Sequence, residues 1–126
     1  MALEDRLAQL RKCLERLREV LGEEKNPIVR DSAIKRFELC FEVLWKSLKD
    51  YLEREGILCR SPRGCLKEAF SLGLIDDQDE WLSILNDRNL SVHVYLEELA
   101  EEIFERLPSH LKAMETLLAK LEKELF

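Results

Sequence analysis

Leucines recur along the first 21 residues of the chain at alternating steps of four and three. They are Leu3, Leu7, Leu10, Leu14, Leu17 and Leu21. Because an α-helix has about 3.6 residues per turn, this spacing places every leucine on one face of a helix, with charged residues on the others. Gly22 predicts the end of this helix. Such a one-sided stripe must be buried against similar stripes, so we expect a bundle of helices.

The second predicted helix carries more apolar residues than one core face requires. Asp31 is its expected cap, and it runs to about Glu55. Besides the core-facing stripe, it has a second apolar set that includes Cys40, Val43 and Trp45. This surplus indicates either a central helix or one that faces a partner, and we expect a homodimer or a higher even oligomer. The core-facing stripe is Ile34, Phe37, Phe41, Leu44, Leu48 and Tyr51.

Three further helices follow from caps and periodicity. Ser61 and Pro62 have the residue types that begin a short third helix, which Gly73 terminates. A fourth is capped by Asp76 or Asp77, and a long fifth helix covers residues 95–125. No segment shows the alternation of a strand. The predicted fold is therefore all-α, an antiparallel up-and-down bundle of about five helices in a single domain over residues 1–126.

Composition narrows the function classes. The chain has 126 residues, with 20 Lys and Arg against 26 Asp and Glu, a net charge of −6. A chain this acidic does not coat itself broadly in nucleic acid, although a local basic site remains open. No apolar run reaches the roughly 18 residues of a membrane span, and the first residues are unlike a secretory signal. We expect a cytoplasmic protein without membrane contact, whose four cysteines are free thiols.

The residue types give little support for a metal site or a cofactor site. The two histidines, His93 and His110, are not part of a Glu-x-x-His pair, so a di-iron site lacks its ligands. Cys59 and Cys65 flank a turn, but the second ligand pair of a zinc site is missing. The chain has neither a glycine-rich phosphate loop nor a nucleophile elbow. We therefore expect no metal and no cofactor.

The most polar junction between helices lies at residues 86–95. Arg88 and His93 are five residues apart, so an unbroken helix would separate them by about 140°. They converge only if the helix ends between them, and Ser91 is a candidate cap for that break. The alternative is purely structural: Arg88 caps the helix, His93 fills a polar notch and Tyr95 packs its ring. Spacing by itself favours this structural alternative.

The pattern Arg-x4-His-x-Tyr, present as Arg88, His93 and Tyr95, resembles the motif of HEPN domains, the higher eukaryote and prokaryote nucleotide-binding helical domains. Residues 36–56, 61–75 and 81–89 resemble the subfamily of nucleotidyltransferase substrate-binding proteins, with Trp45 and Trp81 as landmarks. Val94 departs from the subfamily, which has threonine there. The resemblance implies a helical, usually dimeric protein made with a separately encoded minimal nucleotidyltransferase, in a toxin–antitoxin arrangement.

The resemblance also implies roles for individual residues. Catalytic HEPN proteins are metal-independent endoribonucleases, which makes Arg88 and His93 the candidate catalytic pair and Asn89 a supporting residue. Tyr95 would be the acceptor of an adenylyl group from the transferase. The alternative is a non-catalytic subunit that binds nucleotide or substrate for the transferase, and a third hypothesis is an oligomeric scaffold. Independently of the resemblance, three basic residues are candidate phosphate contacts, although a solvated charge cluster is the commoner explanation. They are Arg60, Arg63 and Lys67.

Overall fold

The computed structural model describes residues 2–125, and it is built of five α-helices with no strand in that range. The predicted all-α bundle is confirmed. A short 3-10 turn, η1, separates the last two helices. The elements are α1 (Leu3–Leu21), α2 (Pro27–Arg54), α3 (Pro62–Ser71), α4 (Gln78–Leu90), η1 (Ser91–His93) and α5 (Glu97–Leu125).

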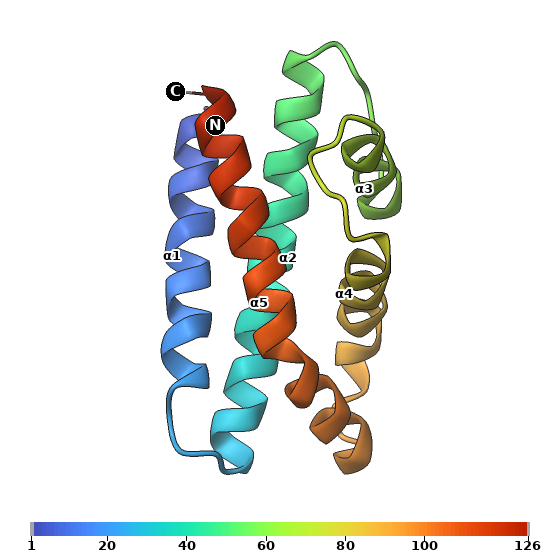
Figure 1. Cartoon of the computed structure of the whole chain (residues 1–126). Coiled ribbons are helices and arrows are strands. Elements are labelled where there is room, and N and C mark those ends of the chain that lie inside the picture. The colour runs from blue at the N-terminus through green and yellow to red at the C-terminus, as the bar shows by residue number, and fades with distance from the viewer. Residues whose placement is uncertain (1, 126) are drawn as a thin grey trace.

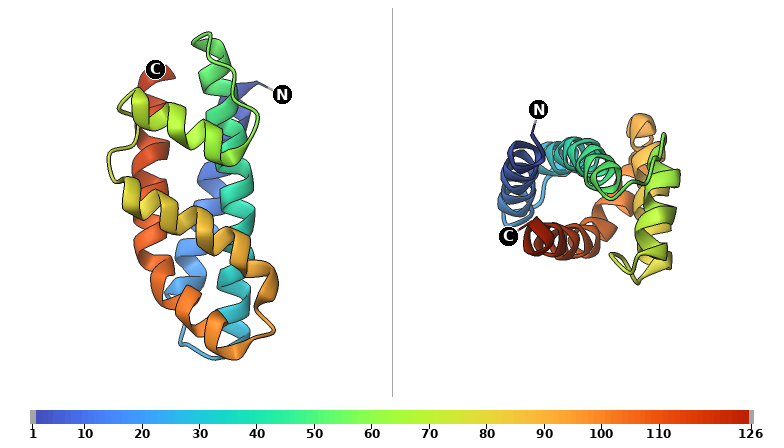
Figure 2. Two further views of the ribbon diagram at one scale, coloured as in Figure 1. Left: turned by 90° about the vertical axis from the view of Figure 1, so that its right-hand side faces the viewer. Right: turned by 90° about the horizontal axis from the view of Figure 1, so that it is seen from above.

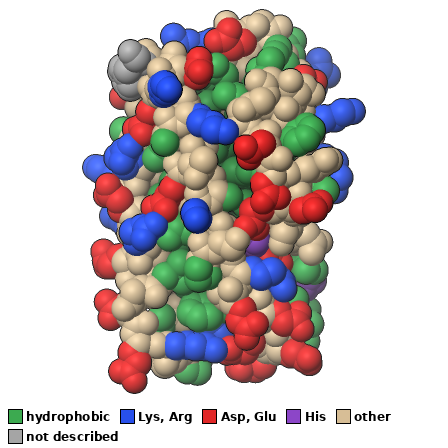
Figure 3. Space-filling view, viewed as in Figure 1, with side chains coloured by type: hydrophobic (Ala, Val, Ile, Leu, Met, Phe, Trp, Pro, Cys, Tyr) green, Lys and Arg blue, Asp and Glu red, His purple; other side chains and the backbone are tan. Residues whose placement is uncertain are grey.

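The three long helices, α1, α2 and α5, form the body of the bundle, with α1 antiparallel to both α2 and α5, which run parallel to each other (Figure 1). The shorter α3 and α4 form an antiparallel pair that lies obliquely across one side of α2 and α5 (Figure 2). Acidic and basic side chains are interspersed over the face in Figure 3, and acidic ones gather at its lower end, where α5 begins. No helix within residues 2–125 combines the length and apolarity needed to cross a membrane.

The predicted leucine stripe of α1 lies in the core. Its first five leucines are almost fully buried, and Leu21 at the helix end is half-buried. They meet apolar stripes of α2 and α5 in one continuous cluster. Burying apolar surface contributes about 25 cal/mol per Å² removed from water, so this cluster is the main stabilising term of the bundle. The leucine spacing therefore did determine which face of α1 is buried.

The start of α2 differs from the prediction. The helix begins at Pro27, four residues before the expected cap Asp31. Asn26 is the cap, and its side-chain oxygen accepts a hydrogen bond from the backbone N–H of Val29 at 2.9 Å. Proline at the first helical position loses no intrahelical hydrogen bond, and its fixed φ suits a helix. Asp31 lies in the next turn and pairs with Arg30 instead.

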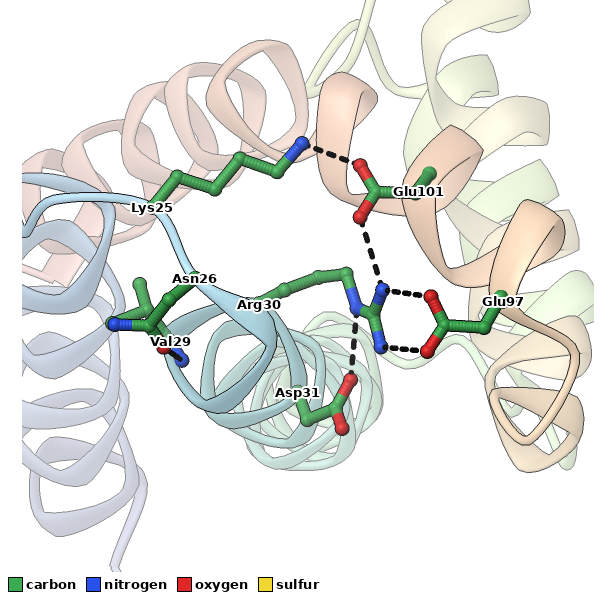
Figure 4. A network of polar contacts seen from close by, with 7 residues as sticks. All are labelled: Lys25, Asn26, Val29, Arg30, Asp31, Glu97 and Glu101. Atoms are coloured by element: carbon green, nitrogen blue, oxygen red, sulfur yellow. Dashed lines mark hydrogen bonds and ion pairs between the residues drawn. The ribbon is translucent and has the colours of Figure 1, made fainter.

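A buried arginine near the start of α2 holds the start of α5 (Figure 4). The Arg30 side chain is only 4% exposed, and its Nη1 donates to Glu97 and Glu101 of α5, both at 2.9 Å. Lys25 adds a second cation to Glu101. The hydrogen bonds from Arg30 lower the pKa of Glu97, which is the first residue of α5. This cluster therefore holds the first turn of α5 against α2, just after the polar segment of residues 86–95.

The apolar surplus of α2 is largely used within the chain. Cys40 is fully buried, and Val43 and Trp45 pack against the core. The reason is that α2 is the central helix and contacts every other element. These three residues therefore give no support for a dimer, contrary to the sequence prediction. The large apolar residue that α2 does expose in this region is Leu39, at 51%.

The prediction of four free cysteines is wrong for two of them. Cys59 and Cys65 form a disulfide, whereas Cys13 and Cys40 are free. The Ser61–Pro62 turn that starts α3 brings the Cα atoms of Cys59 and Cys65 to 5.2 Å, which is within the range that a disulfide spans. The bridge ties the segment after α2 to the first turn of α3.

This disulfide predicts a definite thiol count. Denatured, unreduced protein should show two thiols per chain, and four after reduction. The titration needs denatured protein because burial raises the pKa of the Cys40 thiol and suppresses its reactivity. Loop closure over so short a span is worth about 2 kcal/mol, so reduction should lower the free energy of unfolding by about that amount. Four thiols in unreduced protein would contradict the bridge.

Candidate functional site

The polar junction between α4 and α5 contains the break that the candidate pair requires. Helix α4 ends at Leu90, and η1 follows with Ser91 to His93. Ser91 is buried, and its hydroxyl donates to the backbone carbonyl of Arg88 at 2.6 Å. That bond satisfies a carbonyl in the last turn of α4, so Ser91 marks the end of one helix rather than the start of the next. The α-helical hydrogen-bond pattern therefore ends between Arg88 and His93 and is replaced by a 3-10 turn.

Arg88 projects from the last turn of α4 and is held from two sides. Its guanidinium donates to the Glu42 carboxylate on α2 at 3.2 Å and to the Asn89 side-chain oxygen at 3.3 Å. It also lies over the ring of Phe41, 5.5 Å from the centroid. Burial would raise the pKa of Glu42, but its contacts with Lys46, Trp45 and Arg88 lower it, so the carboxylate stays ionised. The Asn89 side chain is therefore in contact with the Arg88 guanidinium.

His93 and Tyr95 form a second pair, on the far side of the break. His93 Nδ1 lies 3.1 Å from the Tyr95 hydroxyl, and the two rings meet edge to face. Tyr95 is 75% exposed and His93 is exposed as well. The structural alternative, in which His93 fills a notch and Tyr95 packs its ring, does not describe this arrangement. When the hydroxyl accepts from Nδ1–H, the His93 Nε2 is left unprotonated and able to take a proton.

Arg88 and Asn89 line an open hollow of about 400 Å³ between α2 and the end of α4. Lys35 adds a second cation to its wall, and Leu39 and Val92 add exposed apolar surface. Within residues 2–125, no hydrogen bond joins the Arg88 pair to the His93 pair. One chain therefore presents two adjacent polar pairs, on either side of the α4 break.

A buried ionic network, missed in the sequence, lies directly behind this site. Asp87 is 1% exposed and accepts two hydrogen bonds from Arg106 of α5, both at 2.8 Å. His110 is fully buried, with Nε2 at 2.7 Å from Asp87 and Nδ1 at 2.9 Å from Glu80. Ser109 also donates to Glu80. The network fastens the last turns of α4, from which Arg88 projects, to α5.

The electrostatics of Asp87 explain how a carboxylate tolerates this position. Burial would raise the pKa of Asp87, but hydrogen bonds from His110 and Arg106 outweigh it and lower the pKa. The sequence did contain a signal, because Asp87 falls three residues after the buried Ile84, where an apolar residue is expected. A charged residue on the apolar face of a helix indicates a buried partner.

The three candidate phosphate contacts lie away from the hollow. Arg63 and Lys67 project from α3 into a separate groove between α3 and α4. Arg60 is exposed in the segment before α3 and does not line that groove. None of the three forms a salt bridge within residues 2–125. The structure thus brings two of the three basic residues together and separates them from Arg88 and His93.

Known proteins share this architecture. A crystal structure of a protein from Thermus thermophilus is 42% identical with a TM-score of 0.84, covering 89% of this chain and 98% of that one. A structure described as the toxin–antitoxin pair MntA–HepT is similar in fold, with a TM-score of 0.79 at 19% identity, over 96% of this chain and 97% of that one. A Haemophilus influenzae protein named a probable ribonuclease HepT is 29% identical over 105 residues, 76% of this chain and 72% of that protein.

The family resemblance seen in the sequence is confirmed over nearly the whole chain, beyond the segments that suggested it. The matched region runs from the first helix to within three residues of the C-terminus and so includes the hollow, the α4 break and the buried network. The chain belongs to the family described as nucleotidyltransferase substrate binding protein like, whose sequence model matches residues 2–123.

Proposed function

We propose that this protein is a HEPN-type subunit of a two-component system with a minimal nucleotidyltransferase, and that it is a metal-independent endoribonuclease silenced by that partner. The observation that carries the proposal is that half-buried Arg88 and exposed His93 both reach the surface around the break that ends α4. Each of the two side chains is oriented by a polar neighbour. The similarity to a probable ribonuclease HepT and to a toxin–antitoxin structure supports the same assignment.

The proposed reaction follows from the chemistry of the two residues. Imidazole exchanges protons near neutral pH, so His93 Nε2 takes the proton of a ribose 2′-hydroxyl, and the 2′-oxygen attacks the adjacent phosphorus. The P–O5′ bond breaks, which leaves a 2′,3′-cyclic phosphate, and the departing 5′-oxygen takes a proton from water. Arg88 stabilises the negative charge that develops on the phosphate oxygens. Asn89 holds the guanidinium in place. These steps need no metal and no cofactor.

A second copy of the chain would complete the cleft. Leu39 is 51% and Val92 67% exposed, and both line the hollow that contains Arg88. Apolar side chains at the edge of a polar hollow are typical of an interface, and a twofold axis there would bring two Arg88–His93 pairs together. We therefore propose a homodimer or a higher even oligomer, on these residues rather than on Cys40, Val43 and Trp45.

The second candidate function is a non-catalytic subunit that binds RNA, nucleotide or another substrate for the transferase. The family description names substrate binding, and Arg63 and Lys67 lie beside an apolar groove. One experiment separates the two functions: purified protein is incubated with RNA in the presence of a chelator. Cleavage that disappears in an Arg88→Ala, His93→Ala variant supports the ribonuclease. Binding of RNA or nucleotide without cleavage supports the second function.

Tyr95 provides a prediction about regulation. We expect its exposed hydroxyl to accept an adenylyl group when the protein is incubated with the cognate nucleotidyltransferase, ATP and magnesium. The attached nucleotide would occupy the space beside His93 and offer its phosphate to Arg88, excluding RNA by sterics and charge. Mass spectrometry should show the adduct on wild type and not on Tyr95→Phe. Full inhibition by the transferase without an adduct would instead favour steric blocking.

A further inference from the structure

The groove between α3 and α4 is built from two matching helical stripes. On α3, Arg63, Leu66, Lys67 and Phe70 follow one another at positions i, i+3, i+4 and i+7. On α4 the same spacing occurs in Gln78, Trp81, Leu82 and Leu85. Together the two stripes enclose about 350 Å³ between α3 and α4, the helix pair that faces the viewer in Figure 2, left. The groove therefore follows the helix pair rather than a single loop.

The groove exposes apolar surface that the bundle does not use. Phe70 is 42% and Leu82 43% exposed, one from each wall, and Trp81 and Leu85 form a buried floor. An exposed aromatic ring on one wall and an exposed leucine on the other give the groove an apolar lining that the bundle leaves uncovered. At about 1.5 Å per residue, the ten residues of α3 give a wall about 15 Å long, enough for three turns of another helix.

The polar groups of the groove indicate the charge of its occupant. Arg63 and Lys67 lie on one wall without a carboxylate partner among residues 2–125, on a chain with a net charge of −6. Gln78 is the one uncharged polar side chain among the lining residues. A nucleotide base needs several hydrogen-bonding groups for recognition, whereas the apolar stripe of a helix needs none. The groove thus matches an amphipathic helix with acidic residues along one edge.

We propose that this groove is the docking site for an acidic amphipathic helix of the partner nucleotidyltransferase. The existence of that partner rests on the proposed function. The new proposal is the surface of this chain to which the partner binds. The helix places its apolar stripe against Phe70 and Leu82, and its carboxylates face Arg63 and Lys67. The groove and the Arg88 hollow share no lining residue, so the transferase and a second copy of this chain bind to different surfaces.

The test is a calorimetric titration of the full-length chain with its purified cognate nucleotidyltransferase. Leu82→Asp puts a carboxylate into the apolar groove and should raise Kd at least tenfold. A double charge reversal, Arg63→Glu with Lys67→Glu, should also weaken binding and remove most of its salt dependence. Ile28→Asp is the matched control, because it introduces the same carboxylate at an exposed apolar residue that lines neither the groove nor the Arg88 hollow. It should leave Kd for the transferase unchanged.

Each outcome bears on one of the two proposals. A transferase that does not bind the wild-type chain overturns the proposed partnership and the docking site with it. Binding that is equally tight in wild type and Leu82→Asp overturns the docking site alone. Dissociation of the homodimer by Leu82→Asp would make the groove a self-interface, and loss of RNA binding without loss of transferase binding would make it a nucleic-acid site. Circular dichroism of each variant shows that the bundle is intact.

Discussion

Replacing His93 with alanine is expected to lower the rate of RNA cleavage by at least about 100-fold, because a positioned general base contributes about 10²–10⁴ to the rate. The far-ultraviolet circular dichroism and the melting temperature should stay close to those of wild type. His93 is exposed and its ring nitrogen lies within hydrogen-bond distance of exposed Tyr95, so its loss creates no cavity in the core. The measurement is the initial rate on a labelled single-stranded RNA in the presence of a chelator.

Arg88 supplies a second variant with a matched control. Arg88→Ala should lose a similar factor, because the charge that stabilises the phosphate is gone. Arg11→Ala removes an arginine of α1 that also pairs with a glutamate, Glu122, and should leave the rate unchanged. Full cleavage by His93→Ala would disprove its role as the base. Unfolding of His93→Ala would show that the side chain is structural after all.

Replacing Asp87 with alanine is expected to destabilise the bundle by about 1–3 kcal/mol, the cost of leaving a buried hydrogen-bonding group unsatisfied, because the Arg106 side chain is 41% exposed and stays hydrated. The variant leaves Arg106 and the Nε2 of the fully buried His110 without a carboxylate, while His110 Nδ1 keeps Glu80. Asp79→Ala is the matched control, because Asp79 is an exposed aspartate on the same helix. Its effect should stay within about 0.5 kcal/mol. Urea unfolding followed by circular dichroism measures both, and equal midpoints would show that the network contributes little.

The same network predicts how stability depends on pH. The pKa of Asp87 is lower in the folded chain than its ordinary value, because His110 and Arg106 outweigh the effect of burial. The ionised carboxylate therefore stabilises the fold above the unfolded pKa of about 3.9, and this contribution is lost as the pH falls below it. Asp87→Asn does not titrate, so its stability should fall less steeply between about pH 4 and pH 2. Parallel curves for wild type and Asp87→Asn would contradict this.

Much of the architecture could be predicted from the sequence because it depends on neighbours along the chain. The leucine stripe of α1 reports a 3.6-residue period, and the Ser61–Pro62 pair begins α3 by local hydrogen bonding and fixed φ. The end of α4 before His93 is likewise a local event. The family was recognisable for the same reason, since the motif from Arg88 to Tyr95 and the segments 36–56, 61–75 and 81–89 are each continuous in the sequence.

Pairing between distant residues was decided by the tertiary structure. Asn26 and Asp31 are equally good caps by residue type, and the ion pairs of buried Arg30 with Glu97 and Glu101 of α5 hold the earlier turn, which begins at Pro27, in the helix. The Cys59–Cys65 disulfide spans only six residues, but the spacing alone does not specify the 5.2 Å approach of the two Cα atoms.

The candidate site shows the same contrast between what the local sequence predicts and what the tertiary structure decides. The sequence identified Arg88, Asn89, His93 and Tyr95 by type and order, but periodicity could not say whether they are buried or exposed. Their exposure depends on how α4 and η1 pack on α2 and α5. Asp87 is held by residues about 20 positions further along, on another helix. The period of a helix can be predicted from the local sequence because each turn is formed by near neighbours. Burial and ion pairing arise only when whole helices come together.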